Sequence, residues 1–219
     1  LISGQGCELD ATGYSLTIYH SQYFGKHWYI DSIVSLGSNA FDMQRNINFD
    51  LNGNAVNRVA NSTTNGLQKG LSLSSGYEIR DGAFSATMFG SINYSNVNID
   101  GFTETDAQEL NLSISDQTSE LQTSSLGTQL QFTYSTRYGV FIPFMSLSWI
   151  HEFKQSPNTI TGSFASDDFN STFDIKTEKP DLDYFSNVQG ITAVFPRGMS
   201  AFIRMENILA RKFYSITNI

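Results

Sequence analysis

Apolar and polar residues alternate with a period of two along most of this chain. Between residues 126 and 138, the even positions carry Leu, Thr, Leu, Phe, Tyr, Thr and Tyr, and the odd positions carry Gly, Gln, Gln, Thr, Ser and Arg. A helix would mix these two sets on every side, whereas successive residues of a strand point to opposite faces of a sheet. The same alternation recurs at residues 14–18, 67–79, 84–94 and 199–206. The sequence therefore predicts an all-β fold.

The predicted strands are longer than those of an ordinary soluble sheet. Several run for ten residues or more, whereas strands of soluble proteins average about 5–6 residues and a tilted membrane-spanning strand needs about 9–11. The polar face carries Ser, Thr, Gln and Gly in place of the Lys and Glu that coat a soluble surface. This pattern favours an antiparallel, up-and-down transmembrane β-barrel whose apolar face contacts lipid and whose polar face contacts an aqueous interior.

The connections between the predicted strands alternate between short and long. Short turns are expected near residues 22–26, 80–82, 136–139 and 196–198, and long polar connections at 52–65, 98–120 and 156–181. Barrels of bacterial outer membranes have tight periplasmic turns and longer extracellular loops. Aromatic residues gather beside the short turns, as in the girdle that such barrels place at the membrane interface. A soluble β-protein with an aromatic core is the alternative.

Counting the alternating stretches predicts nine spans. They lie near residues 13–22, 26–51, 66–79, 83–97, 121–136, 139–154, 182–196, 198–208 and 211–219. Bacterial single-chain barrels have an even number of strands, and an open sheet would leave unpaired edges in lipid. We therefore expect that further strands, absent from this chain, or a partner close the barrel.

Three segments depart from the simple pattern. In the run 26–51 the apolar residues are even-numbered before Gly37 and odd-numbered after it, which predicts a one-residue bulge at 37–39, with a hairpin as the alternative. Arg45 falls on the apolar face there, so that part is expected to stand above the lipid. Residues 107–115 are interpreted as a strand that extends into a folded external loop. Pro143, in a segment that is apolar on both faces, removes a ladder hydrogen bond.

Composition and charge exclude several classes of function. The chain has 219 residues and a net charge of −8, which is unfavourable for general nucleic-acid binding. A single cysteine, Cys7, excludes a disulfide framework and a multi-cysteine metal site. The three histidines lack metal-binding spacing, and His151-Glu152 has no nucleophile motif beside it. We therefore expect no catalytic residues, no metal and no cofactor, and we infer that the chain is not an enzyme.

Several motifs, in their order and spacing, resemble the β-domain of bacterial autotransporters, the translocators of type V secretion. They are Gly13-Tyr14-Ser15-Leu16-Thr17-Ile18-Tyr19, Trp28-Tyr29-Ile30-Asp31, Arg45, Gly101-Phe102-Thr103-Glu104 with Ala107, Leu126-Gly127, Gly139 with Pro143, and Trp149-Ile150-His151-Glu152-Phe153. In that family, a 12-stranded barrel in the outer membrane exports an N-terminal passenger to the cell surface. The resemblance implies that Tyr14 lies in about the fourth strand, so that roughly three strands precede this chain.

The resemblance also implies a domain division and a set of partners. Residues 1–12 are interpreted as an upstream remnant and residues 13–219 as an incomplete barrel, because the end of the chain lacks the terminal aromatic residue of the family. The expected partners are the chain's own passenger, the barrel-assembly machinery, periplasmic chaperones, and the lipids and lipopolysaccharide of the outer membrane. A porin-like channel, an outer-membrane hydrolase and a soluble β-sandwich binding module remain alternatives.

Seven residues are candidates for the lining of the aqueous pore. The alternation places them on the polar face, where we expect them to hydrate the bore without offering apolar contacts. They are Tyr29, Asp31, Gln129, Gln131, Arg137, Arg204 and Glu206.

Overall fold

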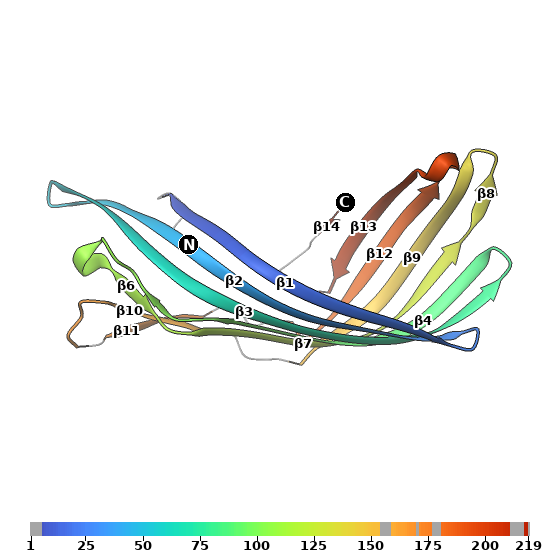
Figure 1. Ribbon diagram of the computed structural model, residues 1–219, viewed down its shortest axis with the longest axis horizontal. Helices are drawn as coiled ribbons and strands as arrows, with labels where there is room; N and C mark the ends of the chain where they lie inside the picture. Colours follow the sequence, from blue (N-terminus) through green and yellow to red (C-terminus); the bar gives the residue numbers. More distant parts are fainter. Residues whose placement is uncertain (1–5, 154–158, 170, 177–180, 211–216, 219) are drawn as a thin grey trace.

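The computed structural model describes residues 6–153, 159–169, 171–176, 181–210 and 217–218. The long strands form one antiparallel sheet (Figure 1). Its members are β1 (Cys7–Phe24), β2 (Trp28–Leu51), β3 (Asn54–Asp81), β4 (Phe84–Ile99), β7 (Gln117–Phe132), β8 (Tyr134–Thr136), β9 (Gly139–Glu152), β12 (Asp183–Val194), β13 (Ser200–Leu209) and β14 (Thr217–Asn218). A smaller sheet contains β5 (Phe102–Thr103), β6 (Leu112–Ile114), β10 (Thr159–Phe164) and β11 (Thr172–Lys176).

The large sheet is an up-and-down meander that curls like half of a barrel (Figure 1). Its order is β1-β2-β3-β4-β7-β9-β12-β13-β14, with β8 paired to β9. β7 and β8 continue one register, so the described residues make eight spans, and the two-residue β14 occupies a ninth position in the sheet. The prediction of an all-β, antiparallel, up-and-down barrel fold is confirmed. Most of the last predicted span, 211–219, lies outside the described residues.

Four tight connections lie at one end of the sheet, which we call the short-turn end. They occupy residues 25–27, 82–83 and 137–138, and the region of the 3-10 turn η2 (Pro196–Gly198). The opposite, long-loop end carries the β2–β3 hairpin and the small sheet. The predicted alternation of connections is therefore confirmed at the short-turn end.

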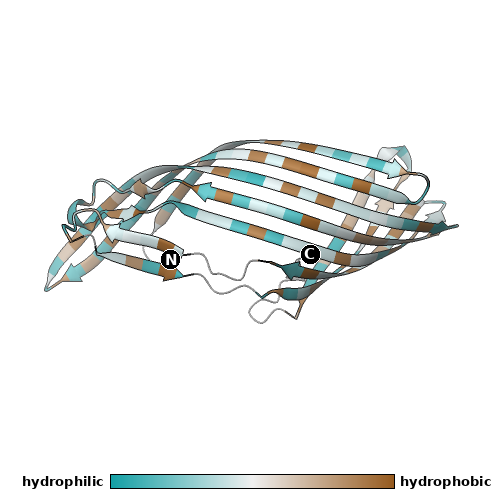
Figure 2. Cartoon of the chain, turned by 90° about the horizontal axis from the view of Figure 1, so that it is seen from below, coloured by the Kyte–Doolittle hydropathy of each residue, from teal (hydrophilic) through white to brown (hydrophobic). Residues whose placement is uncertain are grey.

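The convex outer face of the sheet is apolar and uncovered. Leu71, Ile92 and Leu126 are each at least 50% exposed, and bands of apolar residues cross the strands (Figure 2). The hydrophobic core of the described residues consists of only Ile47, Ala60 and Ala107. A β-sandwich would bury this face beneath a second sheet, and no second sheet covers it in the part of the chain that the structure describes.

The apolar band has the height of a membrane. On β3 it extends from Leu67 to Ile79, a distance of about 40 Å along a strand at about 3.3 Å per residue. At a tilt of about 45° this corresponds to about 28 Å, close to the band of about 25 Å on outer-membrane barrels. Lys69 lies on the outer face near the upper limit of the band, where a lysine extends its amine toward the interface.

Two predictions about the β2–β3 region are wrong. The pairing of β2 with β1 and β3 continues through Gly37 without a shift, so there is no bulge. The expected polar loop at 52–65 is instead strand, because Asn52 and Gly53 turn the chain with φ values of 54° and 85°. This is the backbone that a two-residue Asn-Gly hairpin requires. The apolar residues after Gly37 therefore face inward, where some of them pack against the loop at the long-loop end.

Pro143 explains the interruption between β7 and β8. In the common register of these strands, Phe132 lies opposite Pro143, and the assigned ladder stops at Gln131 and resumes at Tyr134. Proline has no N–H to donate, so the ladder lapses at this position while the strand continues.

The predicted external strand at 107–115 is partly correct. Leu112–Ile114 forms β6, but Gln108–Leu110 forms the 3-10 turn η1. β6 pairs with β5 and β10 in the small sheet.

Candidate functional site

The concave inner face of the large sheet is lined by hydroxyl and amide groups that bond to one another across strands. Ser72 Oγ on β3 donates to Asn93 Oδ1 on β4 (2.7 Å). Asn93 Nδ2 donates to Ser91 Oγ (3.2 Å) and Thr123 Oγ1 (3.4 Å). Ser91 and Ser125 share a hydrogen bond of 2.7 Å between β4 and β7. This part of the wall is polar and uncharged, with its hydrogen-bonding groups partly satisfied by each other.

Aromatic side chains of the inner face lie against glycines of the next strand. A Cβ on Gly127 would lie 2.6 Å from Cζ of Phe89 and 2.8 Å from the carbonyl oxygen of Leu147, closer than real contacts allow. The glycine therefore lets the ring lie along the wall, which keeps it out of the bore. The same relation holds for Tyr29 against Gly76 and for Phe144 against Gly190.

The structure places four of the predicted lining residues at inward positions of two strands. Tyr29 and Asp31 lie on β2, and Asp31 Oδ1 accepts a hydrogen bond from Ser21 Oγ on β1 (2.6 Å). Gln129 and Gln131 lie on β7, where they alternate with exposed outer residues such as Leu130.

A second pair of predicted lining residues forms an ion pair on β13. Arg204 Nη2 lies 3.2 Å from Glu206 Oε2, and Ser186 Oγ on β12 donates to Glu206 Oε1 (2.9 Å). Arg137, in contrast, lies in the turn between β8 and β9, beyond the strands. Its guanidinium stacks over the ring of Tyr138, 4.5 Å from the centroid.

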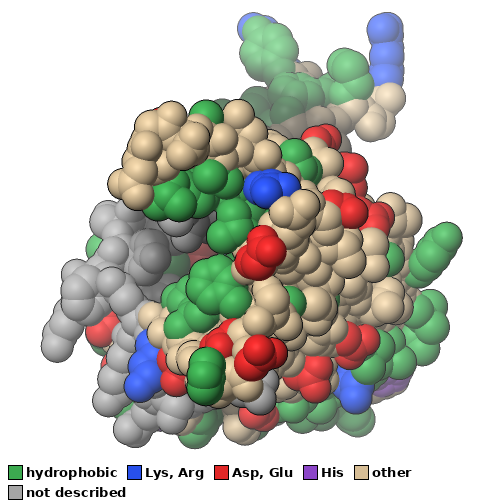
Figure 3. Space-filling model, turned by 90° about the vertical axis from the view of Figure 1, so that its left-hand side faces the viewer, with side chains coloured by type: hydrophobic (Ala, Val, Ile, Leu, Met, Phe, Trp, Pro, Cys, Tyr) green, Lys and Arg blue, Asp and Glu red, His purple; other side chains and the backbone are tan. Residues whose placement is uncertain are grey.

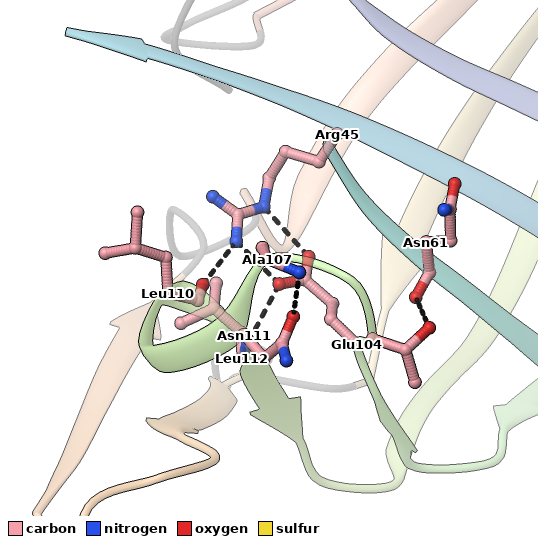
Figure 4. A network of polar contacts seen from close by, with 8 residues as sticks. Arg45, Asn61, Glu104, Ala107, Leu110, Asn111 and Leu112 are labelled. Atoms are coloured by element: carbon pink, nitrogen blue, oxygen red, sulfur yellow. Dashed lines mark hydrogen bonds and ion pairs between the residues drawn. The ribbon is translucent and has the colours of Figure 1, made fainter. Parts of the chain in front are cut away.

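An ion pair that the sequence analysis missed ties the loop after β4 to the long-loop end (Figure 4). Arg45 Nε donates to Glu104 Oε1 (2.8 Å), and Arg45 Nη2 donates to Glu104 Oε2 (2.6 Å) and to the carbonyl oxygen of Leu110 (3.0 Å). The backbone N–H of Leu112 also donates to Glu104 Oε2 (2.8 Å). Glu104 is only 7% exposed, and its hydrogen bonds raise the pKa of Arg45. Two-point pairing of this kind is both strong and directional.

Apolar packing completes this junction, which we call the loop latch (Arg45, Glu104 and the Ile47–Ala60–Ala107 cluster). Ile47 on β2 and Ala60 on β3 face inward and bury Ala107, with Leu110 packed beside them. This packing explains the change of apolar face after Gly37: beyond the apolar band the outer face contacts water and the inner face contacts the loop. In the sequence, Ile47 and Arg45 were the available signals for this junction, because both lie on the face that becomes the inner one after Gly37.

The His151 region lies on the outer face and brings together three polar groups. Asp183 Oδ1 lies 2.9 Å from His151 Nδ1 and accepts a hydrogen bond from Trp149 Nε1 (3.0 Å). The ring of Phe153 packs edge-on against His151, with centroids 4.9 Å apart. A tryptophan with its N–H satisfied is typical of a membrane interface. No group of three metal-binding side chains occurs among the described residues.

An apolar convex face and a polar concave face are the features of an outer-membrane β-barrel. The family model described as autotransporter beta-domain matches residues 2–206. The chain belongs to the autotransporter β-domain family. This autotransporter β-domain is accordingly an outer-membrane β-barrel of the translocator class, as the motifs implied. A search of curated proteins found no match. No helix in the described part of the chain is long and apolar enough to cross a membrane.

Proposed function

We propose that this autotransporter β-domain anchors an N-terminal passenger in the outer membrane and exports it to the cell surface. The observation that carries the proposal is the inner wall, where Ser72, Asn93 and Ser125 present hydroxyl and amide groups. An unfolded segment can slide past such groups because they bond to each other and to water and offer little apolar surface for adhesion.

The orientation follows from the two ends of the sheet. Short turns face the periplasm and long hairpins face outward in outer-membrane barrels, so the loop latch stands on the cell surface. In the described residues, β1 pairs only with β2. In a family of 12-stranded barrels, strands encoded outside this chain pair with its free edge. The barrel-assembly machinery, periplasmic chaperones and lipopolysaccharide are the further proposed partners.

The lining residues are proposed to set the properties of the bore. Arg204 and Glu206 carry its paired charges on β13, while Tyr29, Asp31, Gln129 and Gln131 line the remaining wall. Arg137 belongs to the periplasmic rim. Replacing Arg204 and Glu206 together by Ala is expected to change single-channel conductance and selectivity. Unchanged values would count against this lining.

Cross-linking tests the export path directly. In a Cys7→Ser background, the full-length protein carries either Gln129→Cys on the inner face or Thr128→Cys on the outer face, one residue apart on β7. A passenger with one cysteine is stalled during export. We expect a disulfide to Gln129→Cys and none to Thr128→Cys. Equal cross-linking of both, or cross-linking of Thr128→Cys alone, would refute passage along this wall.

A further inference from the structure

Two neighbouring short turns each present an arginine at the same rim of the barrel. Arg137 lies in the β8–β9 turn, and Arg197 lies in η2 between β12 and β13. A Cβ on Gly139 would lie 3.3 Å from Cα of Phe195, and the rings of Phe141 and Phe195 meet edge to face at 6.0 Å. The two turns are therefore packed side by side, at the upper right of Figure 1.

No carboxylate balances these two arginines along their own strands. Residues 121–151 and 184–205 contain no Asp or Glu. In contrast, Arg80 at the end of β3 is paired with Glu78 at 2.7 Å and is followed by Asp81. At the opposite end, which faces the viewer in Figure 3, acidic side chains gather with basic ones among them, while the side chains that project at the far end of that view include basic ones with no acidic side chain beside them. The β8–β9 and β12–β13 turns thus form a cationic patch.

A neighbouring ring holds the guanidinium of Arg137, and the backbone of the η2 turn places Arg197 at the same rim. The Arg137 guanidinium lies over the ring of Tyr138 and donates from Nη2 to the Tyr138 hydroxyl, which orders the planar group. Its Nε and Nη1 donors are not used by this contact. Arg197 has a φ of 69° and precedes Gly198 with a φ of 80°. A left-handed conformation is unfavourable for arginine, and strain of this kind is commonly found at functional sites.

This rim lies level with the headgroups of the inner leaflet. Phe132 and Tyr134, which precede the turn, are 46% and 59% exposed on the outer face, and Tyr138 is 60% exposed. Exposed aromatic residues mark the interface between acyl chains and headgroups. Arginines just beyond them therefore meet the plane of lipid phosphates, for which the guanidinium is a two-point donor.

We propose that Arg137 and Arg197 make this part of the rim a binding site for the headgroup phosphates of anionic phospholipids in the periplasmic leaflet. The site rests on the orientation proposed above but does not depend on passenger export. An anionic lipid is attracted by two arginines that no nearby carboxylate neutralises. A zwitterionic lipid binds more weakly, because its own ammonium group is repelled by them. The consequence is a preferred lipid at the β8–β9–β12–β13 sector of the periplasmic rim.

Lipid selectivity in nanodiscs tests the site. The full-length protein is reconstituted in phosphatidylethanolamine discs with spin-labelled phosphatidylglycerol or phosphatidylcholine, and the immobilised fraction of each label is measured. We expect a preference for phosphatidylglycerol in the wild type. Replacing both arginines (Arg137→Gln with Arg197→Gln) should lower that preference by about fivefold per arginine, since each cation near a lipid surface contributes about that factor (about 1 kcal/mol).

Two further variants separate this site from net charge and from misfolding. Arg58→Gln with Lys176→Gln removes the same charge from the long-loop end, away from the apolar band, and should leave the preference intact. Arg137→Lys with Arg197→Lys keeps both cations and should retain it. An absent preference in the wild type, an equal loss in the Arg58→Gln/Lys176→Gln control, or an equal loss in the double lysine variant would each overturn the proposal. Because both faces of a disc carry the same lipids, the result is independent of orientation and of export.

Discussion

Arg45 is the residue on which the loop latch depends. Its guanidinium is the counter-charge of Glu104, whose carboxylate is nearly buried, while Arg45 itself is 33% exposed. Removing one partner of such a pair leaves an uncompensated charge, and after allowance for exposure we expect Arg45→Leu to cost about 1–3 kcal/mol of loop docking. This corresponds to exchange of the Leu112 amide that is about fivefold to 150-fold faster, because that N–H bonds to Glu104.

Arg58→Leu is the matched control for this substitution. Arg58 also lies on an inward position of the projecting hairpin, so both changes remove one cation from the same surface. Hydrogen exchange should remain as in the wild type for Arg58→Leu. Equal protection of the Leu112 amide in both variants would mean that apolar packing alone docks the loop.

Asp167 gives a pH dependence to the turn between β10 and β11. The backbone N–H groups of Phe169 and Ser171 donate to its carboxylate at 2.9 and 2.7 Å, and they lower the pKa of Asp167 below its ordinary value of 3.8. A lowered pKa stabilises the turn above pH 3.8, and this contribution disappears as the pH falls through the lower, folded-state value. We expect protection of these two amides, measured by hydrogen exchange corrected for intrinsic rates, to be constant from neutral pH to about pH 4.

In Asp167→Asn, the amides of Phe169 and Ser171 should no longer lose protection from exchange at low pH. In Asp168→Asn, they should lose it as in the wild type. Were the wild type to lose protection already at pH 5 to 6, another group would control the turn.

The partners of individual residues were the least accessible property of the sequence. The alternation correctly assigned Gln129 to the inner face and Leu130 to the outer face, because neighbouring residues of a strand must diverge. Glu104 as the partner of Arg45 could not be inferred in the same way. The two are 59 residues apart, and only the fold of the intervening loop brings them together.

The pairing of neighbouring strands depends on the glycines of the inner face. In Gly127→Ala, the new methyl group would collide with the ring of Phe89 and with the backbone of Leu147, which cannot rotate away. Overpacking of this kind costs about 1–3 kcal/mol. We expect a lower midpoint of urea unfolding in lipid, followed by tryptophan fluorescence. Gly37→Ala is the control, since its nearest contacts are at 3.6 Å or more, and it should unfold as the wild type does. Indistinguishable midpoints would exclude a packing role for Gly127.

Element boundaries were predictable where local chemistry decides them. Asn52-Gly53 is itself a strong hairpin signal, but the polar composition of the following residues suggested a loop. Those residues form strand because, beyond the membrane, a polar outer face is what water favours. The bulge was inferred from the change of apolar face alone. That change reflects a different neighbour on the inner side, Ala107, with no change of register.

The whole molecule exposes far more surface than a soluble protein of its mass. Its accessible area is 15193 Å² for 24.4 kDa, whereas a soluble monomer of that mass exposes about 10,000 Å². The excess arises because a single curved layer has two bare faces and two edges. Lipid can cover the apolar outer face, but it cannot satisfy the edge of β1, which pairs only with β2 among the described residues, since backbone groups in lipid require hydrogen-bond partners.

The exposed apolar face and the edge of β1 predict different behaviour in solution for the 219-residue chain and for the full-length protein. We expect the 219-residue chain to need detergent to remain monodisperse and to lack heat-modifiable migration on gels, because in the part that the structure describes β1 pairs only with β2 and does not close the sheet. The full-length protein, with strands pairing at β1, should resist cold sodium dodecyl sulfate and shift on boiling. A chain that stays monodisperse without detergent would show that the apolar face is buried against protein, and the membrane assignment of that face would then be wrong.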